Sequence, residues 1–414
     1  MGRPILAAAG FQPALFAHPA LFAHPSLFAH PALSAHPQGH PVTTLNTYDV
    51  AIAGGGIVGA ACAAECASSG LKVFVAEPGP IGGGATAAGM GHIVVMDDSP
   101  AQIALTNYSR TLWMQLAPHL PADVEYVAAG TLWVAADEEE MEEVKRKHGI
   151  YESIGVRAET LGPADLAGAE PNLRPGLAGA LLIPDDAVIY PPCAARYLLE
   201  CARQSGAEIR IGAAAELSGE GIKLRDGSFI AAGITVNATG AWAPELTPGI
   251  EVRRRKGHLV ITDRYPGWVH HQLVELGYLK SAHSISTDSV AFNVQPRKTG
   301  QLLIGSSRQY GVEYSAVDTH MLTRMLQRAQ EYMPALAEVS AIRCWTGFRA
   351  ATPDKLPLIG PCTSGSRLYL ATGHEGLGIT TSLATAKLVT DQILGRTSAI
   401  PVEPYWPDRK QDHE

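Results

Sequence analysis

The hydrophobic pattern opens with short apolar runs that end in glycine or an acid. The run YDVAIAG begins at Tyr48, and the run KVFVAE ends at Glu77. Continuous apolar runs of this length predict parallel strands that are buried on both faces. The alanine-rich stretch from 57 to about 69 predicts a helix between them, which Gly70 ends. The first ordered unit is therefore strand, glycine turn, helix and strand.

Two later stretches repeat the buried-strand pattern. ITVNATG ends at Gly240, and RLYLATG contains a strand over Leu368–Thr372 that is followed by a helix to about Leu394. Between these units the pattern changes to alternating positions in HLVIT, SVAFNVQPR and QLLIGSS, which predicts antiparallel strands. The stretch MLTRMLQRAQEYMP predicts a helix over that sheet, with Met321, Met325 and Met333 in the core.

These patterns predict an α/β protein with two domains. A discontinuous Rossmann-like domain would take 47–94, 191–250 and 346–398. The two excursions, 95–190 and 251–345, would form a mostly antiparallel sheet with helices, including an acidic helix from Glu138 to Ile154. Residues 399–414 would be a C-terminal tail.

Residues 1–46 follow none of these patterns. His-Pro recurs at His18, His24, His30 and His36. Proline at every sixth position blocks a continuous helix and removes backbone donors. With Arg3 as its one basic residue, the segment also lacks the charged end of a secretory signal. We expect a disordered leader outside the fold.

Composition narrows the class of protein. Of 414 residues 46% are hydrophobic and 17% charged, which is typical of a globular chain with a large core. The net charge of −8 argues against non-specific nucleic-acid binding. The six cysteines form no CxxC pair, so no metal site is expected, and free thiols suit a reducing compartment. No apolar run predicts a membrane span, and we expect a cytoplasmic protein, or one peripheral to the inner face of the membrane.

The glycine turn after the first strand has the spacing of a dinucleotide site. Gly54 permits a tight turn, Gly56 lets a pyrophosphate approach the backbone, and Gly59 lets helix and strand pack closely. The helix N-terminus offers N–H groups to the phosphates. Glu77 follows the second strand and would accept hydrogen bonds from ribose hydroxyls. With no arginine nearby in sequence, the pattern favours a ribose without a 2′-phosphate.

A second glycine turn decides between NAD and FAD. The segment after Thr372 again places a glycine turn before a helix, so one chain offers two helix N-termini to one long cofactor. A glycine-dense loop over 79–92 adds further close backbone approaches. We expect non-covalent FAD. The predicted cofactor-binding residues are Gly54, Gly56, Ile57, Val58, Gly59, Glu77, Thr86, Gly91, His92, Thr239, Gly240, Trp242, Gly373, His374, Gly376, Leu377, Gly378, Ile379 and Thr380.

At this point the chain resembles the D-amino-acid oxidase family of FAD-dependent oxidoreductases, which includes glycine and sarcosine oxidases. The matching stretches are DVAIAGGGIVGAACA, the loop over 83–91, VNATGAWAP, GFRAATPDKLPLIG and LYLATGHEGLGITTSLATAKLV. The stretches RRRKGHLVITD, VELGYLKSAHS and FNVQPRKTGQLLIGSSRQYG resemble a subgroup with D-hydroxyproline dehydrogenase, opine oxidase and hydrogen cyanide synthase flavoprotein subunits. The resemblance implies hydride transfer from a substrate Cα–H to flavin N5.

The substrate residues follow from the need to bind a carboxylate. Arginine suits a carboxylate best, and the resemblance places the carboxylate anchor at Arg349. Tyr278 and His283 are further candidates, for the carboxylate and for a ring hydroxyl or the amine.

The same resemblance raises two further questions of chemistry. Some relatives attach flavin through a cysteine near the position of Cys344, and some oxidases use a lysine in oxygen reduction, for which Lys256 and Lys280 are candidates.

The leading hypothesis is a dehydrogenase that oxidises cis-4-hydroxy-D-proline to a pyrroline carboxylate. It would pass electrons to a partner subunit or the respiratory chain. One alternative is a glycine or sarcosine oxidase that produces hydrogen peroxide. Another is a non-catalytic FAD-binding assembly protein, against which the intact GFRAATPD block argues.

Overall fold

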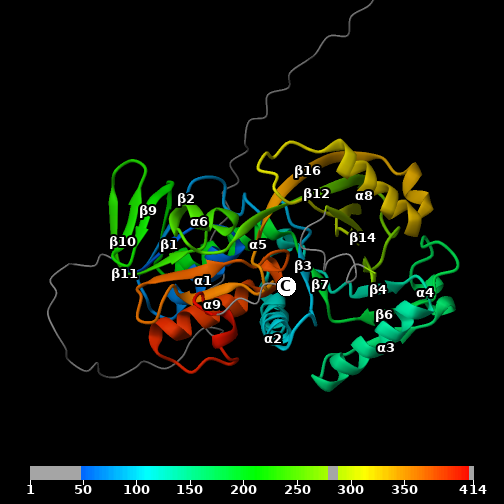
Figure 1. The fold of residues 1–414 in the computed structure, drawn as a ribbon, viewed down its shortest axis with the longest axis horizontal. Coiled ribbons are helices and arrows are strands. Elements are labelled where there is room, and N and C mark those ends of the chain that lie inside the picture. The colour runs from blue at the N-terminus through cyan, green and yellow to red at the C-terminus, as the bar shows by residue number, and fades with distance from the viewer. Residues whose placement is uncertain (1–47, 278–287, 410–414) are drawn as a thin grey trace, which may run out of the picture.

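The computed structural model describes residues 48–277 and 288–409 and is built around two large sheets (Figure 1). The leader over 1–46 lies outside the described residues, as do Tyr278, Lys280 and His283. In Figure 1 the sheet that contains β1 lies on the left, and the sheet that contains β4 and β14 lies on the right. The α/β class is confirmed. Among the described residues, no helix combines the length and the apolar character that crossing a bilayer requires.

The first sheet is the Rossmann-like one. Its strand order is β17-β18-β11-β1-β2-β8, and β10 and β9 extend from β11. Strands β18, β11, β1, β2 and β8 pair in parallel, whereas β17, β10 and β9 pair antiparallel. The bounds are β1 Tyr48–Ala53, β2 Val73–Glu77, β8 Glu208–Ile211, β9 Ala214–Ser218, β10 Gly221–Leu224, β11 Phe229–Asn237, β17 Leu358–Pro361 and β18 Leu368–Thr372.

Helices cover one face of this sheet and a short β-meander covers the other. Helices α1, α5 and α9 pack together over the parallel strands, and the core they share includes Val50, Val75 and Val236. On the opposite face, Ile222 and Ile230 of the meander pack on the sheet. The bounds are α1 Ile57–Ser68, α5 Pro191–Gln204 and α9 Gly378–Leu394. A sheet covered on both faces explains why its strands have continuous apolar runs.

The second sheet is mostly antiparallel, as expected. Its strand order is β16-β12-β15-β14-β13-β4-β6-β5, and the β13–β4 pair is the parallel one among the described strands. The bounds are β4 Thr131–Ala135, β5 Glu159–Leu161, β6 Gly179–Ile183, β12 Arg253–Arg264, β13 Gln272–Glu275, β14 Ser289–Pro296, β15 Gln301–Arg308 and β16 Ala341–Ala351. Strands β3 (His92–Ile93) and β7 (Ala187–Val188) pair antiparallel in a separate two-stranded sheet.

Capped helices pack on the second sheet. Helix α8 (Thr319–Tyr332) begins where Asp318 accepts hydrogen bonds from the N–H groups of His320 and Met321. Met321 and Met325 are buried on its inner face, and Met333 just beyond it is buried too, so their predicted core role is confirmed. Helix α3 (Glu138–Ser153) and helix α4 (Pro163–Ala169) pack near β4, β5 and β6.

Two elements differ from the predicted domain boundaries. Helix α2 (Pro100–Leu116) lies in the first excursion but packs on α9, because buried Trp113 donates its indole N–H to the Ile379 and Thr380 carbonyls at 3.2 Å. Strand β16 runs through the boundary placed at 346, and it pairs along its length with β12. Arg349 therefore lies on a strand of the second sheet.

Candidate active site

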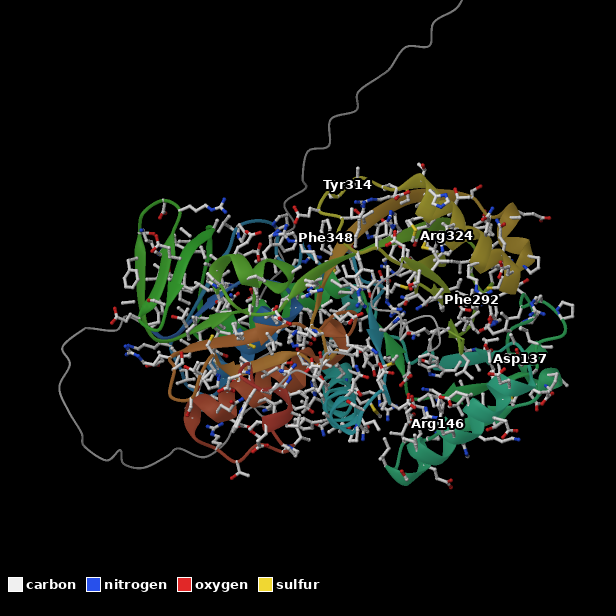
Figure 2. All side chains as sticks on the ribbon, in the orientation of Figure 1. Asp137, Arg146, Phe292, Tyr314, Arg324 and Phe348 are labelled. Carbon is white, nitrogen blue, oxygen red and sulfur yellow. The ribbon has the colours of Figure 1, made fainter. Side chains whose placement is uncertain are left out.

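A cavity of about 580 Å³ lies between the two sheets, and residues of both line it. Most of the predicted cofactor-binding residues line this cavity, namely Gly54, Gly56, Ile57, Val58, Glu77, Thr86, Gly91, His92, Thr239, Gly240, Trp242, His374, Gly376, Gly378 and Ile379. The others, Gly59, Gly373, Leu377 and Thr380, are not among the residues that line it. Phe348 of β16 lies at this junction (Figure 2), where its ring meets Trp242 edge to face at 6.2 Å.

The first glycine turn is shaped by close backbone contacts. Gly54 has φ +109°, and a Cβ there would lie 2.6 Å from the Ala238 carbonyl oxygen. A Cβ on Gly59 would clash with the carbonyl oxygen of Gly54, so Gly59 serves helix–strand packing. Helix α1 begins after Gly56 with no side-chain cap from that residue and no acid in its first turn. Its positive end therefore opens into the cavity and suits a phosphate.

Two residues brace this turn from the loop and from β2. The Thr86 hydroxyl oxygen accepts from the Ile57 N–H at 3.0 Å. The Glu77 carboxylate accepts from the Gly55 N–H at 2.6 Å and from the Gly79 N–H at 3.0 Å. Glu77 is thus oriented by the backbone before any ligand binds.

Arg225, which is distant from Glu77 in the sequence, lines the same cavity, and the sequence did not indicate a cation in this cavity.

The C-terminal turn leads into α9, whose N-terminus also opens into the cavity. Gly373 has φ +79° and packs against Thr352. His374 is buried and its Nε2 lies 2.9 Å from the Thr385 hydroxyl, while burial lowers its pKa to about 3. It is therefore a neutral residue that positions the turn. Thr380 donates to the His92 carbonyl at 2.8 Å, which holds β3 against α9.

Asn237, which was not predicted as a site residue, organises the turn that follows β11. Asn237 ends β11, and its amide N–H groups donate to the Ala243 carbonyl and the Thr247 hydroxyl at 3.0 and 2.9 Å. Its carbonyl oxygen accepts from the N–H and the hydroxyl of Thr239. This fully bonded amide fixes Thr239 and Gly240 at the cavity. The asparagine within VNATG at a strand end was the available signal.

Arg349 is the cation that β16 brings to the cavity. Its Nη1 donates to the Ser307 carbonyl at 2.9 Å, and its guanidinium lies over Gly257, where any Cβ would clash with it. A Cβ on Gly376, in the flavin-side turn, would lie 3.7 Å from Nε of Arg349. The predicted carboxylate anchor thus lies where the second sheet meets the turn before α9.

Of the neighbouring residues on β12, His258 lines the cavity with both ring nitrogens already bonded to the protein, and Lys256 does not line it. His258 is buried, and its ring bonds the Ser307 hydroxyl at 2.9 Å and accepts from the Asp318 N–H at 3.0 Å. Burial lowers its pKa, so it is neutral. Lys256 lies over the Tyr314 ring at 4.2 Å and does not line the cavity. Cys344 is exposed on β16 and does not line it either.

This arrangement fits FAD. Two helix N-termini open into one cavity, and neither is capped by the side chain of its own N-cap residue. Glycines leave room for a pyrophosphate, and a braced acid ends β2. His92, which also lines the cavity, is neutral because burial lowers its pKa to about 4, and its Nε2 has no hydrogen-bond partner among the described residues. Such an atom is available to a bound group.

Comparisons with known proteins agree with this geometry. Residues 49–392 match the family model described as FAD dependent oxidoreductase. Glycine oxidase from Geobacillus kaustophilus is 29% identical over 382 residues, which cover 86% of this chain and 96% of that protein. Hydrogen cyanide synthase subunit HcnC from Pseudomonas aeruginosa is 27% identical, over 88% of this chain and 97% of the subunit.

Solved structures show the same similarity. The crystal structure of the Geobacillus kaustophilus glycine oxidase has a TM-score of 0.78 at 28% identity, covering 88% of this chain and 99% of that one. The L-proline dehydrogenase from P. horikoshii has a TM-score of 0.76 at 25% identity, covering 87% and 96%. The chain belongs to the DAO family of FAD-dependent oxidoreductases, enzymes that act on amino acids and amines.

Proposed function

We propose that this chain is a dehydrogenase that oxidises a cyclic D-imino acid, with cis-4-hydroxy-D-proline as the best candidate and a pyrroline carboxylate as its product. The observation that carries this proposal is the guanidinium of Arg349, held against Ser307 inside the cavity between the sheets. A guanidinium binds a carboxylate through two parallel charge-assisted hydrogen bonds. It would orient the substrate Cα–H toward the flavin side of the cavity.

The lining of the cavity favours the neutral form of the substrate amine, which is the form that transfers a hydride. A positive guanidinium near the amine disfavours its ammonium form. Met90 and Leu259 add apolar surface to the cavity and exclude water, which disfavours the ammonium form further. Bound FAD supplies the hydride acceptor. The chain's own task is to anchor, orient and desolvate the substrate.

The choice of dehydrogenase over oxidase is supported by Lys256. Its ammonium lies over Tyr314 and away from the cavity, and no lysine is among the described residues that line it. One protein of similar fold is an L-proline dehydrogenase, which supports a cyclic imino acid as the substrate class. A partner subunit or the respiratory chain would then accept the electrons.

A glycine or sarcosine oxidase is the second candidate, because glycine oxidases are among the relatives at 25–29% identity. A small substrate would need only Arg349 and the apolar wall of the cavity.

An anaerobic titration followed by air separates the two candidates. Purified holoprotein is mixed with cis-4-hydroxy-D-proline, D-proline, sarcosine and glycine in turn, and bleaching of the flavin absorption is recorded. We expect the cyclic D-imino acids to bleach it fastest and reoxidation in air to be slow. Preference for glycine or sarcosine with rapid peroxide formation would establish the oxidase instead. A flavin that none of the four bleaches would reject both substrate classes.

A further inference from the structure

Asn293 places a buried side-chain amide on the wall of the cavity. It is 8% exposed, it lines the cavity that holds Arg349, and its Oδ1 has no hydrogen-bond partner among residues 48–277 and 288–409. From this we infer that Asn293 forms a subsite that binds a hydroxyl group on the substrate, on the side away from the substrate carboxylate. This inference rests on the proposed function, because it assigns a role within the same cavity.

Alternation along β14 directs this amide toward the cavity. Phe292 and Val294 belong to the core under α8, and the Phe292 ring stacks on Tyr332 of α8 at 4.5 Å. Successive side chains on a strand point to opposite faces, so Asn293 and Gln295 face the flavin side. Figure 2 labels Phe292 among the side chains of the second sheet. Two buried amides on one face of this strand, Asn293 and Gln295, each need a hydrogen-bonding role.

The neighbouring amide already has a structural task. Gln295 donates through Nε2 to the Met90 carbonyl at 2.7 Å, and so it fixes the loop before β3. Asn293 has no such bond. A buried polar group without a partner costs about 1–3 kcal/mol, and such groups are few in native proteins. A ligand that supplies the missing hydrogen bonds removes this cost, whereas the protein alone does not.

The sheet register places Asn293 beyond the reach of the substrate amine. Asn293 pairs with Gly305 of β15, while the Arg349 guanidinium bonds the Ser307 carbonyl two residues further along β15. Two residues of a strand span about 7 Å, and β14 lies about 5 Å to the side of β15. The amine is bonded to the carbon that carries the carboxylate, so it stays near Arg349. Asn293 therefore meets an atom on the far side of a proline-sized ring.

A hydroxyl matches both ends of this amide. A hydroxyl donates one hydrogen bond and accepts others, and an asparagine offers one acceptor and two donors. A site built to bond a hydroxyl discriminates strongly against the analogue that lacks it, because the protein group is then left unpaired. Met90 and Leu259 beside it cannot make that distinction, since both are apolar. Asn293 would thus set the preference for a hydroxylated ring over an unsubstituted one.

The test compares substrate pairs that differ by one hydroxyl. For wild type, Asn293→Leu and Asn293→Ala, the rate of anaerobic flavin bleaching is measured with cis-4-hydroxy-D-proline and with D-proline. The control is Asn172→Ala. The Asn172 amide donates to the Trp268 carbonyl, and Asn172 does not line the cavity. Binding of 4-hydroxybutyrate and butyrate, followed by their perturbation of the flavin spectrum, gives a readout that needs no turnover.

We expect wild type to prefer the hydroxylated member of each pair and Asn293→Leu to reduce that preference by about 10- to 100-fold, as the loss of one or two hydrogen bonds predicts. The rate with D-proline should change much less than the rate with cis-4-hydroxy-D-proline, and the melting temperature should not fall, because the Oδ1 atom of Asn293 has no hydrogen-bond partner among the described residues. Equal loss with both substrates, or a lower melting temperature at an unchanged preference, would show a structural role and overturn the inference. Absence of any hydroxyl preference in wild type would overturn it too.

Failure of the proposed function gives a different result. If no cyclic D-imino acid bleaches the wild-type flavin, the substrate assignment fails, but the binding ratio of 4-hydroxybutyrate to butyrate still tests Asn293. A ratio above one that Asn293→Leu abolishes supports the subsite by itself. A ratio of one in wild type rejects it.

Discussion

The two sheets contribute to the same cavity in different ways. The first sheet contributes backbone: glycine turns at Gly54 and Gly373 and the N-termini of α1 and α9. The second sheet contributes side chains that project from strands, above all Arg349 of β16 and Asn293 of β14. The cofactor side thus depends mainly on backbone groups, with Glu77 and Thr86 as supporting side chains, and the substrate side depends on side chains.

This difference explains how one fold serves many substrates. A backbone-built site tolerates few changes, because its glycines are held by contacts with other backbone atoms, as at Gly54 and Ala238. A side-chain site on strands can change one residue at a time while the sheet stays paired. We therefore expect substitutions on the first sheet to impair folding and cofactor binding together, and substitutions on the second sheet to alter substrate use alone.

The largest effect should come from removing the substrate anchor. Arg349→Leu should lower kcat/KM by about 1,000-fold, because two charge-assisted hydrogen bonds to the carboxylate are lost. Flavin content should stay at the wild-type level. Anaerobic flavin reduction measures the first and the absorption spectrum the second. Arg343→Leu is the matched control, since Arg343 is exposed on the same strand. Loss of flavin from the Arg349 variant would contradict the proposed separation of tasks.

Gly54→Ala should show the opposite behaviour. At φ +109°, with a Cβ placed 2.6 Å from the Ala238 oxygen, alanine should lower the free energy of unfolding by about 1–3 kcal/mol and weaken FAD binding. Gly84→Ala is the control, because Gly84 lines the same cavity but a Cβ there would meet nothing within 4 Å. Denaturant unfolding and flavin titration measure both. Equal behaviour of the two variants would show that steric contact does not govern this turn.

A smaller effect should appear as pH dependence of stability. Burial lowers the pKa of His374 to about 3, so between that value and the unfolded value near 6.5 the unfolded chain binds the extra proton. The stability that neutral His374 contributes is therefore fully present above pH 6.5, and it is lost as the pH falls from 6.5 towards 3. By pH 5 the loss should reach about 2 kcal/mol for this residue.

His374→Gln should reduce that acid-side loss, since glutamine does not titrate, although it also alters the bond to Thr385. His119→Gln, at an exposed position, is the control. Denaturant unfolding at pH 7.5 and pH 5 gives the slope for each variant. An unchanged slope in the His374 variant would mean that other groups set the acid sensitivity.

The smallest effect should come from Cys344→Ser. The thiol is exposed and does not line the cavity, so the variant should keep the flavin content and bleaching rate of wild type. Denaturation should release the flavin from both proteins into solution. Flavin that stays with denatured wild type but leaves the serine variant would reveal a covalent bond and refute the expectation of non-covalent FAD.

Much of the fold could be predicted because its signals are local. The strand over Leu368–Thr372, the helix that ends at Leu394 and the buried methionines of α8 follow from periodicity within a few residues. The position of α2 could not be predicted in this way. Its place depends on Trp113 bonding the start of α9, and these residues are more than 260 positions apart.

The candidate site divides along the same line. The glycine turns, Glu77 and Thr86 were predicted, and the structure gathers them around one cavity. Asn237 was not predicted because asparagine is common in turns and at strand ends. Asn293 lies within β14, and only the structure shows that it lines the cavity. The side on which Lys256 lies depended on strand register, which a short alternating segment does not reveal by itself.

The sequence alone determined the α/β class, the two cofactor-binding turns and the place of Arg349 within its motif. The class and the turns rest on residues that are close together along the chain, where backbone sterics and periodicity act directly, whereas the place of Arg349 rests on the resemblance of its motif to a family. Only the tertiary structure decided that Arg349, Gly257 and Asn293 line one cavity, that Lys256 does not line it and that Oδ1 of Asn293 has no partner in the described part of the chain. Those facts depend on which strands pair and in which register, and packing over the whole chain selects both.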